Sequence, residues 1–303
     1  MNTLRIALDW TANTNHTGFF VARELGYYSE RGIDLAISTP ADDNYETTPA
    51  KKLELRQVDF ALAPFESVLS LHTKENSLDV RAIAALLQED ISAVVALSSS
   101  HITRPKDLDG RTYASYKARY EDSIIRQMIR NDGGSGDVQV LYPEKLGIWN
   151  TLLTNAADST WIFDNWEGVE AETTGVALTK FRLADYGIPY AYSPVLIANQ
   201  EAIEQNRDLY TSFLEATKQG FLFAKANAKA AVEILSKYVP ERDTQAIDLL
   251  KSQTYTSVQY GDEISWGKME ADRIQRFVDW LNELGLEKAP LPVDQLFTNE
   301  LLG

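Results

Sequence analysis

The feature that most constrains this chain is the alternation of short apolar runs with helical segments. Residues 4–8, 33–38 and 80–86 are rich in branched side chains, which is typical of strands, and a helical stretch follows the first two. Such alternation predicts a mostly parallel sheet with helices on both faces. A second alternating set begins at residues 94–97 and continues to about Tyr190. The sequence therefore predicts an α/β protein with two doubly wound lobes.

The two lobes are not consecutive along the chain. The predicted crossings lie near Ser92 and Ser193, so lobe 1 comprises residues 1–92 and 193–303, and lobe 2 comprises residues 93–192. After a strand at residues 194–198, helical spacing predicts helices that pack on a lobe, over residues 207–226, 228–238, 244–252 and 268–283. Two crossings predict a hinge and an interlobe cleft, with the ligand at the carboxyl ends of strands.

Composition excludes several classes of function. The 303-residue chain has a net charge of −15, which argues against a nucleic-acid partner. There is no cysteine, and the three histidines are far apart, so neither a metal site nor a cofactor is expected. The sequence contains no run of about 18 apolar residues, so no membrane span is predicted. We expect a soluble monomer that binds a small molecule.

The start of the chain bears on location. Met1 is followed almost at once by the first strand, without a basic and apolar leader. The expectation is either a cytoplasmic protein or an exported protein whose signal has been removed.

The loop after the first strand is the richest candidate for a binding site. It contains Asp9, Trp10, Asn13, Asn15 and His16. Trp10 could stack on a flat ring while the acid or an amide meets its polar edge. The alternative is a buried tryptophan with residues that cap the next helix.

Charged residues follow two other strands. Glu66 begins a helix, where the helix dipole favours a carboxylate, and it could instead accept a bond from a ligand amine. Lys117, Arg119 and Tyr120 precede the helix predicted from residue 121. Two cations oppose the dipole there, so they are candidates for binding an anionic group, with surface solvation as the alternative.

Aromatic residues gather at the end of lobe 2. Trp161, Asp164 and Trp166 lie at a strand end, and Tyr190 and Tyr192 precede the second crossing. We expect Trp166 and Trp10 to sandwich a planar heterocycle whose amino edge is bound by carboxylates.

Four separated segments, which together span essentially the whole chain, carry a resemblance to a known family. Residues 8–18 (LDWTANTNHTG), 161–168, 192–197 and 297–301 resemble bacterial formylaminopyrimidine-binding proteins, the solute receptors of an ABC importer that salvages thiamine breakdown products. The resemblance implies the periplasmic-binding-protein type II fold, a thiamine-related aminopyrimidine ligand, an ABC permease partner and an extracytoplasmic location.

The wider family also contains the fungal enzyme that makes the thiamine pyrimidine from pyridoxal phosphate and its own histidine. At the positions that match its Schiff-base lysine and donor histidine, this chain has Ala63 and Ser67, and it lacks cysteines for the iron segment. We therefore predict binding without catalysis. Another flat heterocycle, such as a flavin, remains an alternative ligand, and Lys117 with Arg119 would suit a phosphorylated or carboxylated relative.

Overall fold

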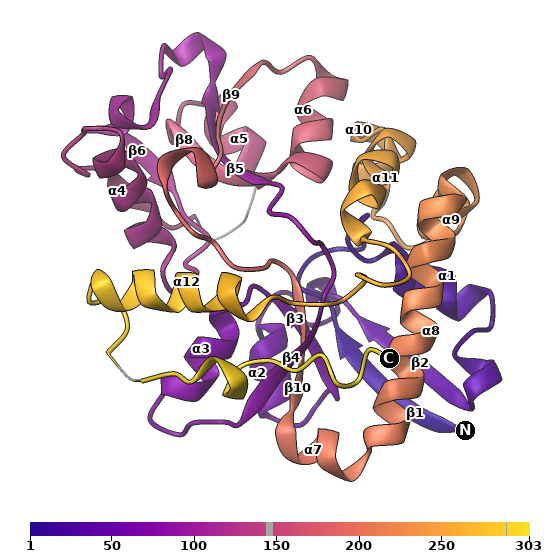
Figure 1. Ribbon diagram of the computed structural model, residues 1–303. Coiled ribbons are helices and arrows are strands. Elements are labelled where there is room, and N and C mark those ends of the chain that lie inside the picture. Colours follow the sequence, from indigo (N-terminus) through magenta and orange to yellow (C-terminus); the bar gives the residue numbers. More distant parts are fainter. Residues whose placement is uncertain (144–147, 289) are drawn as a thin grey trace. The chain divides into compact units, whose positions relative to one another are not determined.

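The computed structural model describes residues 1–143, 148–288 and 290–303, and it divides the chain into two units (Figure 1). Unit 1 consists of Met1–Asp90, Ala191–Val278 and Ala289–Gly303. Unit 2 consists of Ile91–Tyr190 and Asp279–Lys288. Residues 279–288, predicted to lie in lobe 1, belong to unit 2 in the structure.

Unit 1 is built on a five-stranded sheet with the order β2-β1-β3-β10-β4. Strand β1 pairs in parallel with β2 and β3, while β10 is antiparallel to both β3 and β4. The interior of this sheet is almost wholly apolar. Its strands are β1 (Asn2–Ala7), β2 (Ile33–Ser38), β3 (Phe60–Ala63), β4 (Val80–Ala85) and β10 (Val195–Asn199).

Unit 2 repeats this topology in the order β7-β6-β8-β5-β9. Its antiparallel strand is β5, which pairs with β8 and β9. In both units the antiparallel strand is the first strand along the chain after the chain crosses from the other unit. Strand β5 follows β4, and β10 follows β9. The strands are β5 (Ser92–Leu97), β6 (Thr112–Ala114), β7 (Gln139–Leu141), β8 (Ser159–Phe163) and β9 (Leu178–Phe181).

Helices flank both sheets, and their apolar faces supply the core. In unit 2 they are α4 (Glu121–Asn131), α5 (Ile148–Leu153) and α6 (Val169–Thr174). Unit 1 contains α1 (Thr17–Glu24), α2 (Pro49–Glu54), α3 (Glu66–Thr73), α7 (Gln200–Gln205), α8 (Arg207–Ala226), α9 (Ala228–Leu235), α10 (Glu241–Ala246) and α11 (Leu249–Ser257). Helix α12 (Ala271–Glu283) begins in unit 1 and ends in unit 2.

Two helix predictions near the C-terminus are wrong in their limits. The helix expected over residues 244–252 is broken, because the Asp248 carboxylate accepts a bond from the Lys251 backbone N–H at 3.0 Å and caps a new helix there. The helix expected from residue 268 begins at Ala271, after Gly267 with φ +77°. Strand β9 and helix α6 were not predicted at all.

The closest helix packing in unit 1 joins α1 to α8. A Cβ atom on Gly220 would lie 2.1 Å from the Gly18 carbonyl oxygen, and one on Gly18 would lie 2.0 Å from the Phe221 ring. Both glycines are therefore required by close approach of the two helices, and Phe221 fills the space beside them. This contact fixes where α1 begins, and the loop before it is the first candidate binding segment.

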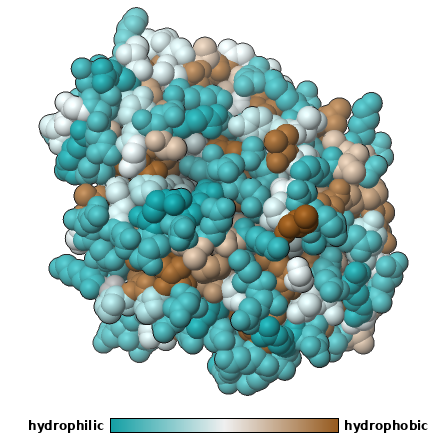
Figure 2. Space-filling view, in the orientation of Figure 1, coloured by the Kyte–Doolittle hydropathy of each residue, from teal (hydrophilic) through white to brown (hydrophobic). Residues whose placement is uncertain are grey.

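The face shown in Figure 2 is mostly covered by hydrophilic residues, with small hydrophobic areas among them. Among the described residues, no helix is both long and apolar enough to cross a bilayer.

We expect Gly220→Ala to lower the free energy of unfolding by about 1–3 kcal/mol, because the added methyl group overpacks the contact with α1. Urea denaturation at equilibrium measures this. The neighbouring exposed Gln219→Ala should change stability by no more than about 0.5 kcal/mol. Equal stability of the two variants would contradict the packing argument.

Candidate ligand-binding site

The loop after β1 is organised around the buried imidazole of His16. Its Nδ1 atom lies 3.3 Å from the Asn13 backbone N–H and must accept that bond, so Nε2 carries the proton. Nε2 then donates to the Asp9 carboxylate at 2.7 Å. The Asn13 side chain accepts from the backbone N–H of Asn15 at 2.8 Å. Asn13, Asn15 and His16 are thus buried and shape the loop, while Asp9 keeps a partly exposed carboxylate.

Helix α11 is joined to this loop by hydrogen bonds between buried side chains. The Thr14 hydroxyl lies 2.8 Å from that of Ser252 and 2.7 Å from that of Thr256. The Thr17 hydroxyl donates to the Gln253 amide oxygen at 2.6 Å. Since all these groups are buried, each needs its partner, and together they fix the backbone that presents Asp9 and Trp10.

Trp10 is half-buried and has an aromatic neighbour that the sequence analysis missed. The ring of Tyr45 lies with its centroid 6.2 Å from that of Trp10, at an interplanar angle of 65°. Tyr45 belongs to no helix or strand, and no periodic pattern could have connected it with Trp10.

Glu66 and Tyr192, two further candidates, are both buried in unit 1. Glu66 is the first residue of α3, as predicted, beside the dipole of the helix N-terminus. The Tyr192 hydroxyl accepts a bond from the Glu270 backbone N–H at 3.0 Å, and the Arg273 guanidinium covers its ring at 4.1 Å. Tyr192 is therefore engaged on its face and at its hydroxyl by residues of its own unit.

The backbone N–H groups of the loop before α4 bind the carboxylate of Glu121, the first residue of that helix. Glu121 accepts bonds from the Tyr113 hydroxyl at 2.6 Å and from the backbone N–H groups of Tyr116 and Ala118 at 3.0 and 3.2 Å. Burial raises the pKa of Glu121, and these hydrogen bonds oppose the rise. The amide groups that would favour an external anion here are thus already occupied.

The two cations of that loop point to different partners. Arg119 donates to the buried Glu287 carboxylate at 2.7 Å, and Tyr120 donates to the same carboxylate at 2.8 Å. The ammonium of the exposed Lys117 lies 5.3 Å from the ring centre of Tyr142. The structure therefore does not bring Lys117 and Arg119 together as one anion site, because Glu287 neutralises Arg119.

Asp164 is also neutralised within unit 2. Its carboxylate, 3% exposed, accepts bonds from Lys180 at 2.6 Å and from Arg182 at 2.5 Å. Both cations come from the segment of strand β9 and the residue after it, which the sequence analysis did not predict. The interpretation of Asp164 as an acceptor for a ligand amine is therefore not supported by its contacts.

The aromatic residues of unit 2 pair differently from the prediction. Trp166 lies in a π-helical turn at Asp164–Gly168 and is only 4% exposed. Trp161 lies with its ring centroid 5.4 Å from that of Tyr190. Trp161 and Tyr190 are brought together, whereas Trp166 is a core residue of its turn.

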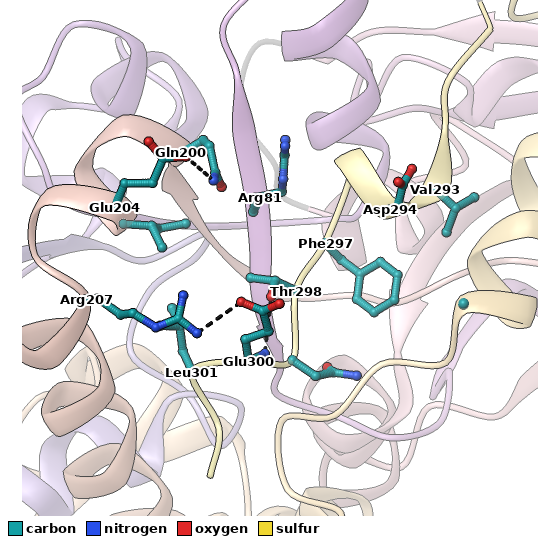
Figure 3. Close-up of a pocket in the computed structure, with 13 residues that line it drawn as sticks. Arg81, Gln200, Glu204, Arg207, Val293, Asp294, Phe297, Thr298, Glu300 and Leu301 are labelled. Atoms are coloured by element: carbon teal, nitrogen blue, oxygen red, sulfur yellow. Dashed lines mark hydrogen bonds and ion pairs between the residues drawn. The ribbon is translucent and has the colours of Figure 1, made fainter.

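A separate open pocket of about 530 Å³ lies in unit 1 beside residues 297–301, near the C-terminus (Figure 3). Its charged walls are internally paired: Arg207 donates to Glu300 at 3.0 Å, and Gln200 donates to Glu204 at 2.8 Å. Asn299 forms two bonds with the backbone of Met269, at 3.0 and 2.9 Å. Residues 297–301 thus contact both the segment before α12 and strand β4, where the Thr298 backbone N–H donates to the Ala82 carbonyl at 2.9 Å.

Among the described residues, no group of three or more His, Cys, Asp or Glu side chains could hold a metal ion.

Comparison with known proteins identifies the family of this chain. A family model described as "NMT1/THI5 like" matches residues 13–231. The chain belongs to this family.

The NMT1/THI5-like relatives include both binding proteins and enzymes. The formylaminopyrimidine-binding protein of Halalkalibacterium halodurans is 22% identical over 99% of this chain and 90% of its own length. The 4-amino-5-hydroxymethyl-2-methylpyrimidine phosphate synthase of Legionella pneumophila is 25% identical over 98% and 91%. The riboflavin-binding protein of Chloroflexus aurantiacus is 25% identical over 100% and 86%.

Solved structures confirm the fold. The alkanesulfonate-binding protein of Xanthomonas axonopodis matches 97% of this chain and 98% of its own chain, with a TM-score of 0.73 at 13% identity. This NMT1/THI5-like chain therefore has the periplasmic-binding-protein type II fold, with two α/β lobes of matching strand order.

We expect Arg119→Ala to lower the free energy of unfolding by about 1–3 kcal/mol, because it removes a charged donor from the buried Glu287 carboxylate. Lys117→Ala, in the same loop, removes an exposed cation and should cost no more than about 0.5 kcal/mol. Chemical denaturation of both variants makes the comparison. Equal effects would mean that the two cations have equivalent surroundings.

Proposed function

We propose that this chain is a non-catalytic solute receptor for a thiamine-related aminopyrimidine. The observation that carries the proposal is the loop after β1, in which a buried hydrogen-bond network presents Trp10 and Asp9. Similarity to a formylaminopyrimidine-binding protein along nearly the whole chain supports the choice of ligand.

The chemistry of the loop suits a flat ring with an amino group. Trp10 offers an aromatic face for stacking. One oxygen of Asp9 accepts the His16 bond, and a carboxylate has about four acceptor positions in all. The remaining positions suit a ligand amine, and a negative carboxylate strengthens such a bond.

By the same resemblance, we propose an ABC permease as the partner and an extracytoplasmic site of action, with a monomeric receptor. The receptor would then bind the ligand and release it to the importer for uptake. Occupancy would be set by affinity alone, since no covalent step is involved.

A flavin is the second candidate ligand, because a riboflavin-binding relative is 25% identical to this chain. An isoalloxazine is also flat and would use the same stacking contact. The Legionella synthase is the corresponding argument for an enzyme. Against it stand Ala63 and Ser67, at the positions that match the lysine and histidine of the fungal pattern.

We expect Trp10→Ala to weaken aminopyrimidine binding by about 1–3 kcal/mol, the range found for stacking of bases on aromatic side chains. Trp10→Phe keeps a ring and should lose less. Isothermal titration calorimetry with 4-amino-5-hydroxymethyl-2-methylpyrimidine measures both. If a folded Trp10→Ala variant binds as tightly as the parent, the ligand does not stack on this residue.

A second experiment tests the absence of catalysis. After incubation with pyridoxal phosphate and exhaustive dialysis, we expect no aldimine absorbance, because alanine at position 63 cannot form a Schiff base. An Ala63→Lys variant serves as the comparison at the matching position. An aldimine band retained by the parent protein would revive the enzyme interpretation.

A further inference from the structure

We propose that Tyr45 is a specificity-determining contact for the ligand, and that it forms with Trp10 an aromatic corner on unit 1. The inference rests on the proposed function, and it adds a residue from a different loop to the binding site. Tyr45 lies in the loop after β2 and Trp10 in the loop after β1, so the corner is made by the loops that follow two neighbouring parallel strands.

The backbone at Tyr45 has a left-handed conformation that is unfavourable for residues other than glycine. Asn44 has φ +54° and Tyr45 has φ +64°, so two consecutive residues other than glycine occupy the left-handed region. This conformation costs free energy that glycine would avoid. Residues held this way cluster at ligand-binding positions, where the surrounding structure maintains the strain.

The surrounding loop supplies that restraint. The turn Pro40–Asp43 is closed by a bond from the Thr39 backbone N–H to the Asp42 carboxylate at 2.7 Å. The Tyr45 backbone N–H donates to the Pro40 carbonyl at 2.8 Å. Lys52, whose side chain is 10% exposed, binds the Asp43 carboxylate at 3.0 Å and ties the turn to α2. Tyr45 is therefore presented by a braced turn.

The position of the side chain fits a contact surface. Tyr45 is 54% exposed although it lies against Trp10, at an angle of 65° between the rings. A planar ligand stacked on one ring of such a corner meets the other ring near its edge, an arrangement that aromatic pairs favour. A phenol adds a hydrogen-bond donor at the rim, which a plain hydrophobic wall lacks.

The phenol is suited to donate a hydrogen bond. Partial burial raises the pKa of Tyr45, and the negative charge of the buried Asp243 on α10 raises it further. Tyr45 therefore keeps its proton at neutral pH. The ligand class that would use it is a planar nitrogen heterocycle with a ring nitrogen or carbonyl oxygen as acceptor, in addition to the amino group assigned to Asp9.

Two variants separate the ring from its hydroxyl, with 4-amino-5-hydroxymethyl-2-methylpyrimidine as the probe in calorimetric titrations. Tyr45→Gly removes the side chain and relieves the left-handed backbone. It should weaken binding at least about tenfold while its Tm stays at or above that of the parent. Tyr45→Phe keeps the ring and should lose about threefold to tenfold, as expected for one hydrogen bond. The matched controls Tyr255→Ala and Tyr255→Phe alter an exposed tyrosine on α11 and should bind as the parent does.

The outcomes are distinguishable. A parent protein that does not bind the probe overturns the proposed function and this inference with it. A parent that binds, together with a Tyr45→Gly variant that binds equally well, overturns only the role of Tyr45. If Tyr45→Phe matches the parent while Tyr45→Gly is weakened, the aromatic corner is supported and the hydrogen bond is wrong. If Tyr45→Gly loses its fold, Tyr45→Phe at unchanged Tm decides the question: weaker binding supports the contact with Tyr45, and parent-like binding overturns the hydrogen-bonding role of its phenol.

Discussion

The candidate site depends on the buried hydrogen bonds between the loop after β1 and helix α11. Thr14 and Thr17 bind Ser252, Thr256 and Gln253, partners more than 230 residues away along the chain. Each buried polar group left without its partner would cost about 1–3 kcal/mol, so the loop and the helix hold one another in a single arrangement. Trp10 and Asp9 are therefore positioned by unit 1 itself, which lowers the ordering cost of binding.

A second constraint comes from the way the chain passes between units. Within the described residues, each sheet has one antiparallel member, which is the first strand after the chain crosses between units: β5 in unit 2 and β10 in unit 1. Each arriving strand lies between two strands of its new sheet, and its residues are almost all buried. Each sheet is therefore completed by a strand that follows directly after a crossing of the chain.

The sequence predicted the fold well because strands and helices carry local patterns. The limits predicted for β2 and α8, and the predicted start of α4, coincide with the structure. The contacts of the candidate site residues were predicted less well because they are not local. The ion pairs of Arg119 with Glu287 and of Asp164 with two cations near β9 were not predicted, because those partners lie far along the chain or in a strand without a clear pattern. Tyr45 was missed because a strained turn, not a periodic pattern, brings it to Trp10.

The central claim is that the protein binds a thiamine-related aminopyrimidine reversibly, with a flavin as the second candidate ligand. The most direct test is thermal unfolding of the parent protein with 4-amino-5-hydroxymethyl-2-methylpyrimidine, its phosphate ester, thiamine and riboflavin. At about 100 times its Kd, a ligand should raise the free energy of unfolding by about 2.7 kcal/mol. The account predicts this stabilisation for the aminopyrimidine, with little effect of riboflavin. Stabilisation by riboflavin alone, or by none of the four compounds, would contradict it.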